Sequence, residues 1–249
     1  MSSPIIFYDI PSKLSGGAWS PNTWKTRYAL NIKGVPYKTQ WVEYPDIEAL
    51  ALKIGAPPTG AKDDGSPSYT LPIIQDPNTG KVISDSFIIA EYLDSTYPSG
   101  NTLFPSSSKP LVEAFEAGLM TAIGPILLLQ LALSNGILNP SSEKYFRATR
   151  EAKFGKKIEE FSPAGVQRDG DLAKAQEGLA TLDGWLSKNS GPYVLGETVS
   201  YADGVLGGWL TWVKLTHGAD SAAWKNIASW HGGRWGKYIT SLEKYASVA

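Results

Sequence analysis

The fold is decided by Ser84-Asp85-Ser86-Phe87-Ile88-Ile89-Ala90-Glu91-Tyr92-Leu93, with Leu71-Pro72 a short distance upstream. Apolar residues at 88, 89, 92 and 93 recur at helical spacing. The serines and the aspartate precede them, where a helix leaves backbone N–H groups unpaired. Such a helix start can hold a small charged ligand, with N–H groups for a carboxylate and Asp85 for an ammonium. The alternative is that Ser84 or Ser86 only caps the helix.

Leu71-Pro72 favours the ligand-binding interpretation. A proline after an apolar residue, followed by Ile73-Ile74, predicts a strand entered through a constrained peptide bond, with the cis form as one option. The start of such a strand offers an unpaired N–H and C=O to an extended peptide.

This arrangement resembles the glutathione transferase family. The resemblance rests on Leu71-Pro72, then Asp85-Ser86, then Ile89 and Tyr92-Leu93. It implies that Leu71 and Pro72 pair with the cysteinyl backbone of glutathione. It also implies that Asp85 and Ser86 hold the γ-glutamyl end.

Composition limits the other function classes. The chain has 249 residues, enough for one large domain or two smaller ones. Its net charge is −1 with no basic run, so we expect neither nucleic acid nor an anionic membrane surface as a partner. No uninterrupted apolar run of about 18 residues and no leader pattern are present, which predicts a cytoplasmic protein with no membrane attachment.

Cysteine is absent, which excludes disulfides, thiolate metal sites and redox chemistry of protein thiols. Any reactive sulfur must therefore come with a ligand. The two histidines, His217 and His231, lack metal-ligand spacing, so we expect no metal and interpret both as structural or surface residues.

Residues 1–97 read as a thioredoxin-like α/β domain. Turn and apolar patterns predict strands at 5–8, 35–42, from 72 and at 81–83, with helices at 20–30, 46–54 and 86–97. Ser20 stands at the cap of the first helix, Pro21 at its first position and Gly34 just past its end. The Pro- and Gly-rich segment 55–69 predicts a long surface loop, which we expect to cover part of the glutathione site.

A linker at 98–110 is followed by an all-helical domain at 111–249. We expect helices over 111–138, bent at Gly124-Pro125, from 140 towards 161, and over 171–188. Ser200 and Asp203 match a capping box, so Asp203→Ala should lower stability by about 1 kcal/mol or more.

The resemblance thus covers nearly the whole chain and implies the glutathione transferase fold. The segment 20–30 looks like the first helix of the β-etherase-related enzymes, and most like that of the fungal-specific class A transferases. By this resemblance Ser20 activates the thiol of glutathione. The alternative is that Ser20 only caps the helix, with Asn22 and Thr23 as reserve donors. Tyr8 reads as core or pocket wall.

Other binding residues are less firmly indicated. Lys53, or else Lys62, is the candidate for the glycyl carboxylate, although each reads equally well as a solvated lysine. The candidate walls of the electrophile pocket are Trp19, Leu119, Ile123 and Ile126, and the helical stripe among them is also typical of a core. Trp209 and Trp212, one turn apart, read as packing residues.

The predicted function is a serine-type glutathione transferase, typical of detoxification, that attacks hydrophobic aromatic electrophiles, with β-aryl ethers among the candidate substrates. Glutathione is its expected co-substrate. The alternative is a ligandin that carries hydrophobic aromatic molecules with little turnover. The resemblance also implies a homodimer.

Overall fold

The computed structural model describes residues 3–249. Its α/β half holds a four-stranded sheet in the order β2-β1-β5-β6. The strands are β1 (Ile5–Asp9), β2 (Tyr37–Trp41), β5 (Ile73–Asp76) and β6 (Lys81–Ser84). β1 runs parallel to β2, whereas β5 is antiparallel to both of its neighbours. The mixed sheet is that of the predicted thioredoxin-like half.

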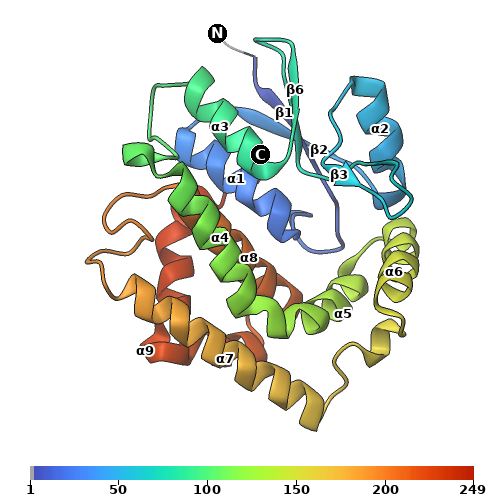
Figure 1. Cartoon of the computed structure of the whole chain (residues 1–249), viewed down its shortest axis with the longest axis vertical. Helices are drawn as coiled ribbons and strands as arrows, with labels where there is room; N and C mark the ends of the chain where they lie inside the picture. The colour runs from blue at the N-terminus through green and yellow to red at the C-terminus, as the bar shows by residue number, and fades with distance from the viewer. Residues whose placement is uncertain (1–2) are drawn as a thin grey trace.

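Helices complete this half of the molecule. α1 (Pro21–Lys33) connects β1 to β2 and packs beside α3 (Ser86–Thr96), while α2 (Ile47–Ile54) lies apart from both (Figure 1). α1 begins at Pro21, whose missing N–H costs nothing in the first turn, and ends at Gly34 with φ 68°. Both signals were read correctly from the sequence.

The rest of the described chain is helical, apart from isolated bridges. Its long helices are α4 (Lys109–Ile123), α5 (Leu127–Ile137), α6 (Pro140–Phe154), α7 (Val166–Leu186), α8 (Tyr201–His217) and α9 (Ala222–Leu242). A 3-10 turn, η3 (Gly124–Ile126), joins α4 to α5 and confirms the bend predicted at Gly124-Pro125. The connection between α3 and α4, which covers most of the linker predicted at 98–110, holds a further 3-10 turn, η2 (Pro105–Ser107).

The continuous segment 109–137 is long and apolar enough to span a membrane by length and composition, and an 18-residue stretch within it has a mean hydropathy of 1.8. In the structure it bends at η3, and α4 packs against α7 and α8. Leu119, Ile126 and Leu129 are buried. Packing in the helical domain accounts for part of its apolar character, since 39 % of the apolar stretch is buried.

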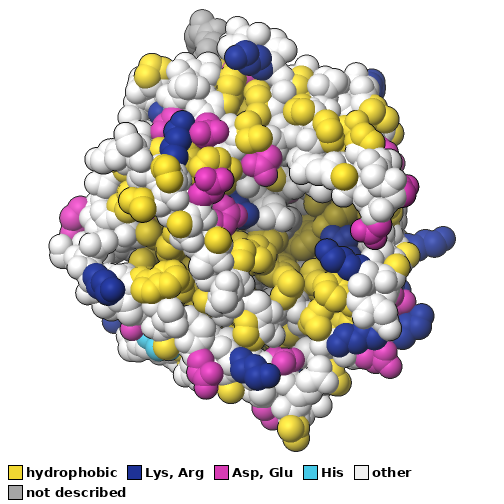
Figure 2. All heavy atoms as spheres, in the orientation of Figure 1, with side chains coloured by type: hydrophobic (Ala, Val, Ile, Leu, Met, Phe, Trp, Pro, Cys, Tyr) yellow, Lys and Arg dark blue, Asp and Glu magenta, His cyan; other side chains and the backbone are white. Residues whose placement is uncertain are grey.

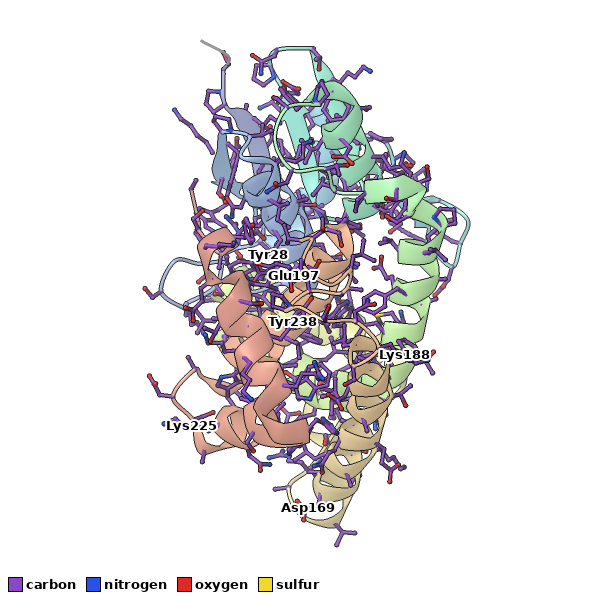
Figure 3. The ribbon with its side chains drawn as sticks, turned by 90° about the vertical axis from the view of Figure 1, so that its left-hand side faces the viewer. Tyr28, Asp169, Lys188, Glu197, Lys225 and Tyr238 are labelled. Carbon is purple, nitrogen blue, oxygen red and sulfur yellow. The ribbon has the colours of Figure 1, made fainter. Side chains whose placement is uncertain are left out.

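α8 is the central buried helix, and its glycines let α1 approach closely. A Cβ atom at Gly208 would lie 2.8 Å from the carbonyl oxygen of Pro21. The Tyr28 and Thr211 hydroxyls are hydrogen bonded at 2.9 Å, and Figure 3 shows Tyr28 where the two halves meet. α1 is thus packed directly against α8 from its first turn to Tyr28.

Several predicted boundaries were wrong. α6 ends at Phe154 and does not run towards 161, because Gly155 adopts φ 66° and terminates it. α7 begins at Val166, five residues before the predicted start. The segment 55–69 is not a plain loop, since β3 (Gly60–Ala61) and β4 (Pro67–Ser68) pair within it. A 3-10 turn, η1 (Tyr44–Asp46), precedes α2.

Candidate active site

Two adjoining hollows lie between the α/β half and the helical half, and Figure 2 shows this side of the molecule as a hollow with hydrophobic side chains inside it. The smaller one, of about 400 Å³, extends to the start of α3. The larger one, of about 670 Å³, extends between α2 and α6. Both are lined by Asn22, Ser68, Thr70 and Leu71. They therefore form one continuous groove.

Leu71 and Pro72 line the smaller hollow, and the peptide bond between them is cis. β5 begins only at Ile73. The backbone of Leu71 makes no hydrogen bond to any other residue in 3–249. Its N–H and C=O are thus available to an extended peptide, as the sequence predicted.

Asp85 lies at the N-terminus of α3 and lines the same hollow. Its Oδ1 accepts hydrogen bonds from the N–H groups of Phe87 (2.8 Å) and Ile88 (3.2 Å). The alternative in which Ser84 or Ser86 caps the helix is wrong, because the cap is Asp85. Its backbone has φ 76° and ψ 132°, which a residue with a side chain rarely adopts.

Ser86 also lines the smaller hollow and is 6 % exposed. Because Asp85 accepts from the N–H groups of Phe87 and Ile88, the N–H of Ser86 is the one in the first turn of α3 without a partner among the described residues. The start of α3 therefore combines the N–H and hydroxyl of Ser86 with the carboxylate of Asp85 in one hollow. That set matches a group that carries both an ammonium and a carboxylate.

An ion pair that joins the two halves closes this end of the groove. Nζ of Lys25, on α1, lies 2.5 Å from Oε1 of Glu116, on α4. Lys25 is buried, whereas Glu116 is partly exposed, and both line the smaller hollow. Neither residue was predicted from the sequence, since they meet only because α1 and α4 both pack on α8.

Ser20 lies at the N-cap of α1 and lines the larger hollow. Its side chain makes no capping hydrogen bond, so the interpretation in which it only caps the helix is not supported by the geometry. It is 4 % exposed. Asn22 is exposed and lines both hollows. A ligand lying across the two hollows would thus pass both side chains.

Thr23 and Tyr8 do not line either hollow. Thr23 is fully buried, and its hydroxyl donates to the carbonyl oxygen of Ser20 at 3.1 Å. The Tyr8 hydroxyl donates to Gln75 at 3.0 Å, and burial raises the pKa of that hydroxyl. Thr23 is therefore not a reserve donor, and Tyr8 is a core residue.

Of the two lysines proposed for the glycyl carboxylate, the structure brings only Lys62 to the groove. Its Nζ lies 2.9 Å from Oε2 of Glu48, and hydrogen bonding to that carboxylate raises the pKa of Lys62. Lys53 is exposed in the last turn of α2 and lines neither hollow.

The walls of the larger hollow are aromatic, but they are not the walls predicted. They include Tyr44 and Tyr69 from the α/β half and Tyr145 from α6. Trp19 is 2 % exposed and packs behind them against Tyr44 and Phe146, with ring centroids 6.4 and 6.3 Å away.

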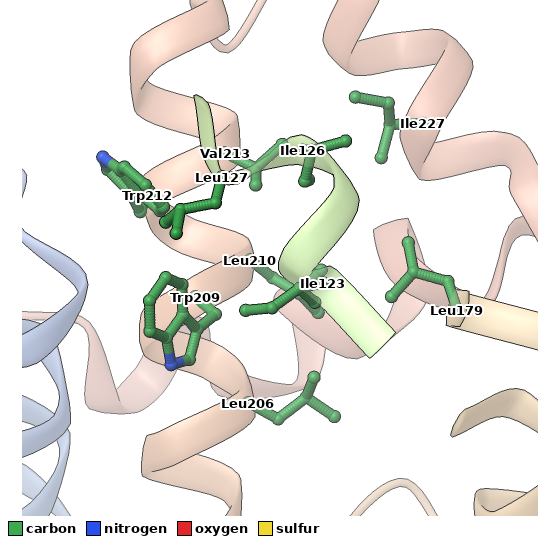
Figure 4. A pocket seen from close by; sticks show the side chains of 10 residues that line it. All are labelled: Ile123, Ile126, Leu127, Leu179, Leu206, Trp209, Leu210, Trp212, Val213 and Ile227. Carbon is green, nitrogen blue, oxygen red and sulfur yellow. The ribbon is translucent and has the colours of Figure 1, made fainter. Parts of the chain in front are cut away.

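The other predicted wall residues lie in the helical core. Leu119 is fully buried and cannot reach the groove. Ile123 and Ile126 line a separate small cavity of about 20 Å³ between α4, η3, α7 and α8 (Figure 4). Trp209 and Trp212 line that cavity too, as packing residues, with ring centroids 5.3 Å apart. Core packing, the alternative interpretation of this stripe, is the one that the geometry supports.

Within residues 3–249 there is no group of three His, Asp or Glu side chains arranged to hold a metal ion. His217 and His231, expected to be structural or surface residues, each have a side-chain partner. The Nε2 of His217 lies 2.9 Å from the side-chain nitrogen of Gln130, and Nδ1 of His231 accepts from Trp235.

Comparison with known proteins identifies the family. Residues 19–96 match the N-terminal domain of glutathione S-transferases, and residues 111–245 match the C-terminal domain. The chain belongs to the glutathione transferase family. It is 35 % identical over 240 residues to the glutathione S-transferase-like protein ustS of Aspergillus flavus, covering 90 % of this chain and 84 % of that protein.

Solved structures of fungal enzymes agree over the whole chain. A glutathione S-transferase of Ceriporiopsis subvermispora, determined in complex with glutathione, is 46 % identical with a TM-score of 0.95 and coverage of 99 % of each chain. The glutathione transferase GSTFuA3 of Phanerochaete chrysosporium is 42 % identical with a TM-score of 0.94, and each chain is covered completely. The family and the fold expected from the sequence are thereby confirmed.

Proposed function

We propose that this glutathione transferase activates the thiol of glutathione through the hydroxyl of Ser20 and directs the thiolate at hydrophobic aromatic electrophiles. The observation that carries the proposal is that the Ser20 side chain, at the N-terminus of α1, is not used to cap the helix. Ser20 lines the larger hollow, and Asn22 lines both hollows. Glutathione is the co-substrate, as in the relative from Ceriporiopsis subvermispora, which was determined with glutathione.

The groove supports one orientation of glutathione. The γ-glutamyl end lies at Asp85 and Ser86, where an ammonium and a carboxylate both find partners. The cysteinyl backbone pairs with Leu71 beside Pro72. The sulfur then reaches the first turn of α1, and the glycyl end lies towards Lys62.

The energies are sufficient for activation. A free thiol with a pKa of about 8.5 is only a few per cent thiolate at pH 7, and lowering that pKa to about 6.5 requires roughly 2.7 kcal/mol. A hydroxyl that donates a hydrogen bond to the thiolate contributes about 1.5–3 kcal/mol. The N-terminus of α1 adds about 0.3–1 kcal/mol.

The test is an ultraviolet titration of the thiolate of bound glutathione against pH, in the parent and in Ser20→Ala. The parent should show a lowered thiol pKa that returns towards the free value in the variant. If the pKa is lowered equally in both proteins, Ser20 is not the activating group, and Asn22→Ala becomes the informative variant. Absence of glutathione binding in both would overturn the proposed function altogether.

A second candidate function is that of a ligandin, and the aromatic lining of the larger hollow favours it. Three tyrosines line that hollow, which is large enough for a molecule of several rings. The test measures turnover of two electrophiles with glutathione, a β-aryl ether and a generic aryl halide. Tight binding of aromatic compounds without turnover of either electrophile would favour the ligandin.

A further inference from the structure

The larger hollow carries a flat aromatic wall built from both halves of the molecule. The rings of Tyr44, in η1, and Tyr145, on α6, are stacked with centroids 5.8 Å apart and an interplanar angle of 12°. Tyr145 is 43 % exposed. The pair therefore offers a ring surface to a planar ligand.

Arg150 lies against this wall without a carboxylate partner. Its guanidinium carbon is 5.3 Å from the centroid of Tyr44 and 4.2 Å from that of Phe146, and Nη1 donates to the Thr149 hydroxyl at 2.9 Å. No carboxylate oxygen in residues 3–249 lies within 4.0 Å of its side-chain nitrogens. An arginine held on aromatic rings and bonded at Nη1 to one hydroxyl keeps its other N–H donors for a ligand.

Lys153, one turn further along α6, also lines the hollow and makes no ion pair with a residue that the structure describes. The wall formed by α6 thus carries two free positive charges. Glu151, which follows Arg150 in the sequence, does not line the hollow and forms ion pairs with Arg147 and Lys157.

The acids near the hollow leave this charge uncompensated. Glu48 is held by Lys62 on the wall of the α/β half, and Asp63 lies on that side as well. Glu43, which precedes η1, accepts hydrogen bonds from Asn139 and Ser142 and does not line the hollow. Charge is therefore separated across the hollow, with α6 the cationic side.

We propose that the larger hollow is specific for aromatic carboxylates, with the aromatic ring against Tyr44 and Tyr145 and the carboxylate on Arg150. Lys153 adds a second, more exposed positive charge. A guanidinium binds a carboxylate through two parallel N–H···O hydrogen bonds, which fixes the orientation of the ring. That an aromatic carboxylate acts as the electrophile rests on the proposed transferase function. That it binds in the larger hollow does not rest on that function.

The binding test compares 2-naphthoate with the neutral 2-naphthamide, titrated against the full chain by calorimetry. The parent should bind the carboxylate about tenfold more tightly, a difference of about 1.4 kcal/mol. Arg150→Gln should abolish the preference, and Lys153→Gln should reduce it two- to threefold. Lys144→Gln, which removes an exposed charge on α6 outside the hollow, should leave it unchanged.

Equal affinity of the parent for the two ligands would overturn the proposal. So would an equal loss of both ligands in Arg150→Gln, since that result would mean that Arg150 only supports the aromatic wall. If Arg150→Gln does not fold, the proposal is tested with Lys153→Gln, since Lys153 is exposed. A preference for 2-naphthoate over 2-naphthamide that neither Lys153→Gln nor 0.5 M salt reduces would contradict an electrostatic subsite.

A kinetic comparison separates this proposal from the proposed function. With glutathione, 4-chloro-3,5-dinitrobenzoate should show a KM about tenfold below that of 1-chloro-2,4-dinitrobenzene, and the ratio should fall to about one in Arg150→Gln. If neither halide is consumed but naphthoate is still preferred, the transferase function fails and the carboxylate subsite stands. Turnover of both with equal KM in the parent would overturn the subsite alone.

Discussion

The hydroxyl of Tyr238 donates a 2.7 Å hydrogen bond to Oδ1 of Asp203, which ties α9 to the first turn of α8. Asp203 is fully buried. The same carboxylate accepts from the N–H of Val194 and from both the N–H and the hydroxyl of Ser200. The predicted capping box is therefore present, and it is one part of a larger buried junction.

Replacing Asp203 by alanine should destabilise the protein by about 3 kcal/mol or more, because several buried donors lose their acceptor. This exceeds the loss of about 1 kcal/mol expected from a helix cap alone. The measurement is chemical denaturation of the parent and the variant. Glu197→Ala, which removes a nearby exposed carboxylate, is the control and should change stability by less than about 0.5 kcal/mol. Similar losses in the two variants would contradict the assignment.

The ion pair of Lys25 with Glu116 gives a second prediction. Glu116→Gln leaves the Lys25 ammonium buried without its carboxylate and removes a negative charge from the hollow at the start of α3, where we propose that the γ-glutamyl end binds. We expect the KM for glutathione to rise about tenfold with a smaller change in kcat, together with a loss of stability. Steady-state kinetics at varied glutathione concentration measures this effect.

Glu113→Gln is the matched control, since Glu113 is exposed on the same helix and does not line the groove. Its kinetic constants should equal those of the parent. If Glu116→Gln lowers stability but leaves the KM for glutathione unchanged, the ion pair joins the two halves without contributing to ligand binding.

Local signals in the sequence predicted the backbone around the smaller hollow of the groove well. The backbone is restricted locally by Pro72, by the helix start at 85–86, and by Pro21 and Gly34 at the two ends of α1. Which residue caps α3 could not be decided from the sequence, because Asp and Ser are equally good caps and only the hydrogen bonds of the Asp85 carboxylate to Phe87 and Ile88 identify it.

The electrophile pocket could not be predicted in the same way. Ile123 has the helical periodicity of a core or of a pocket wall, and the packing of α4 on α7 and α8 decides that it faces inward. Tyr44 and Arg150 are far apart in the sequence and meet only because α6 packs against η1. The early start of α7 is not predicted because the residues that follow Val166, Gln167-Arg168-Asp169-Gly170, carry no apolar periodicity.

A homodimer is expected from the family, and two exposed apolar residues suggest where it forms. Ile88 on α3 is 53 % exposed and Leu111 on α4 is 72 % exposed. The two helices are linked by the ion pair of Glu91 with Lys109 at 3.0 Å. We expect light scattering to give about twice the chain mass of 26.9 kDa for the parent and a monomer for Leu111→Glu.

Val166→Glu provides the control for the dimer, because Val166 is also exposed but lies on α7. That variant should keep the mass of the parent. A monomeric parent at micromolar concentration would remove the dimer, and a dimeric Leu111→Glu would place its interface elsewhere.

His217 gives a prediction about pH. Burial lowers the pKa of its imidazole below the ordinary value of 6.5, and the charge of Arg168 acts in the same direction. Near and below pH 6.5 the unfolded chain therefore binds a proton that the folded chain binds only at lower pH. The contribution of His217 to stability is complete above pH 6.5 and is lost as pH falls through the folded-state pKa.

Urea denaturation at pH 7.5 and at pH 5.5 should accordingly show a loss of stability at the lower pH, and His217→Gln should show a smaller one. Glutamine keeps a polar group near Gln130 but cannot take up the proton. Asp76 and Asp94, whose carboxyl pKa values are lowered, lose their contribution only below about pH 4, outside this window. An equal loss of stability in the parent and in His217→Gln would show that another group titrates.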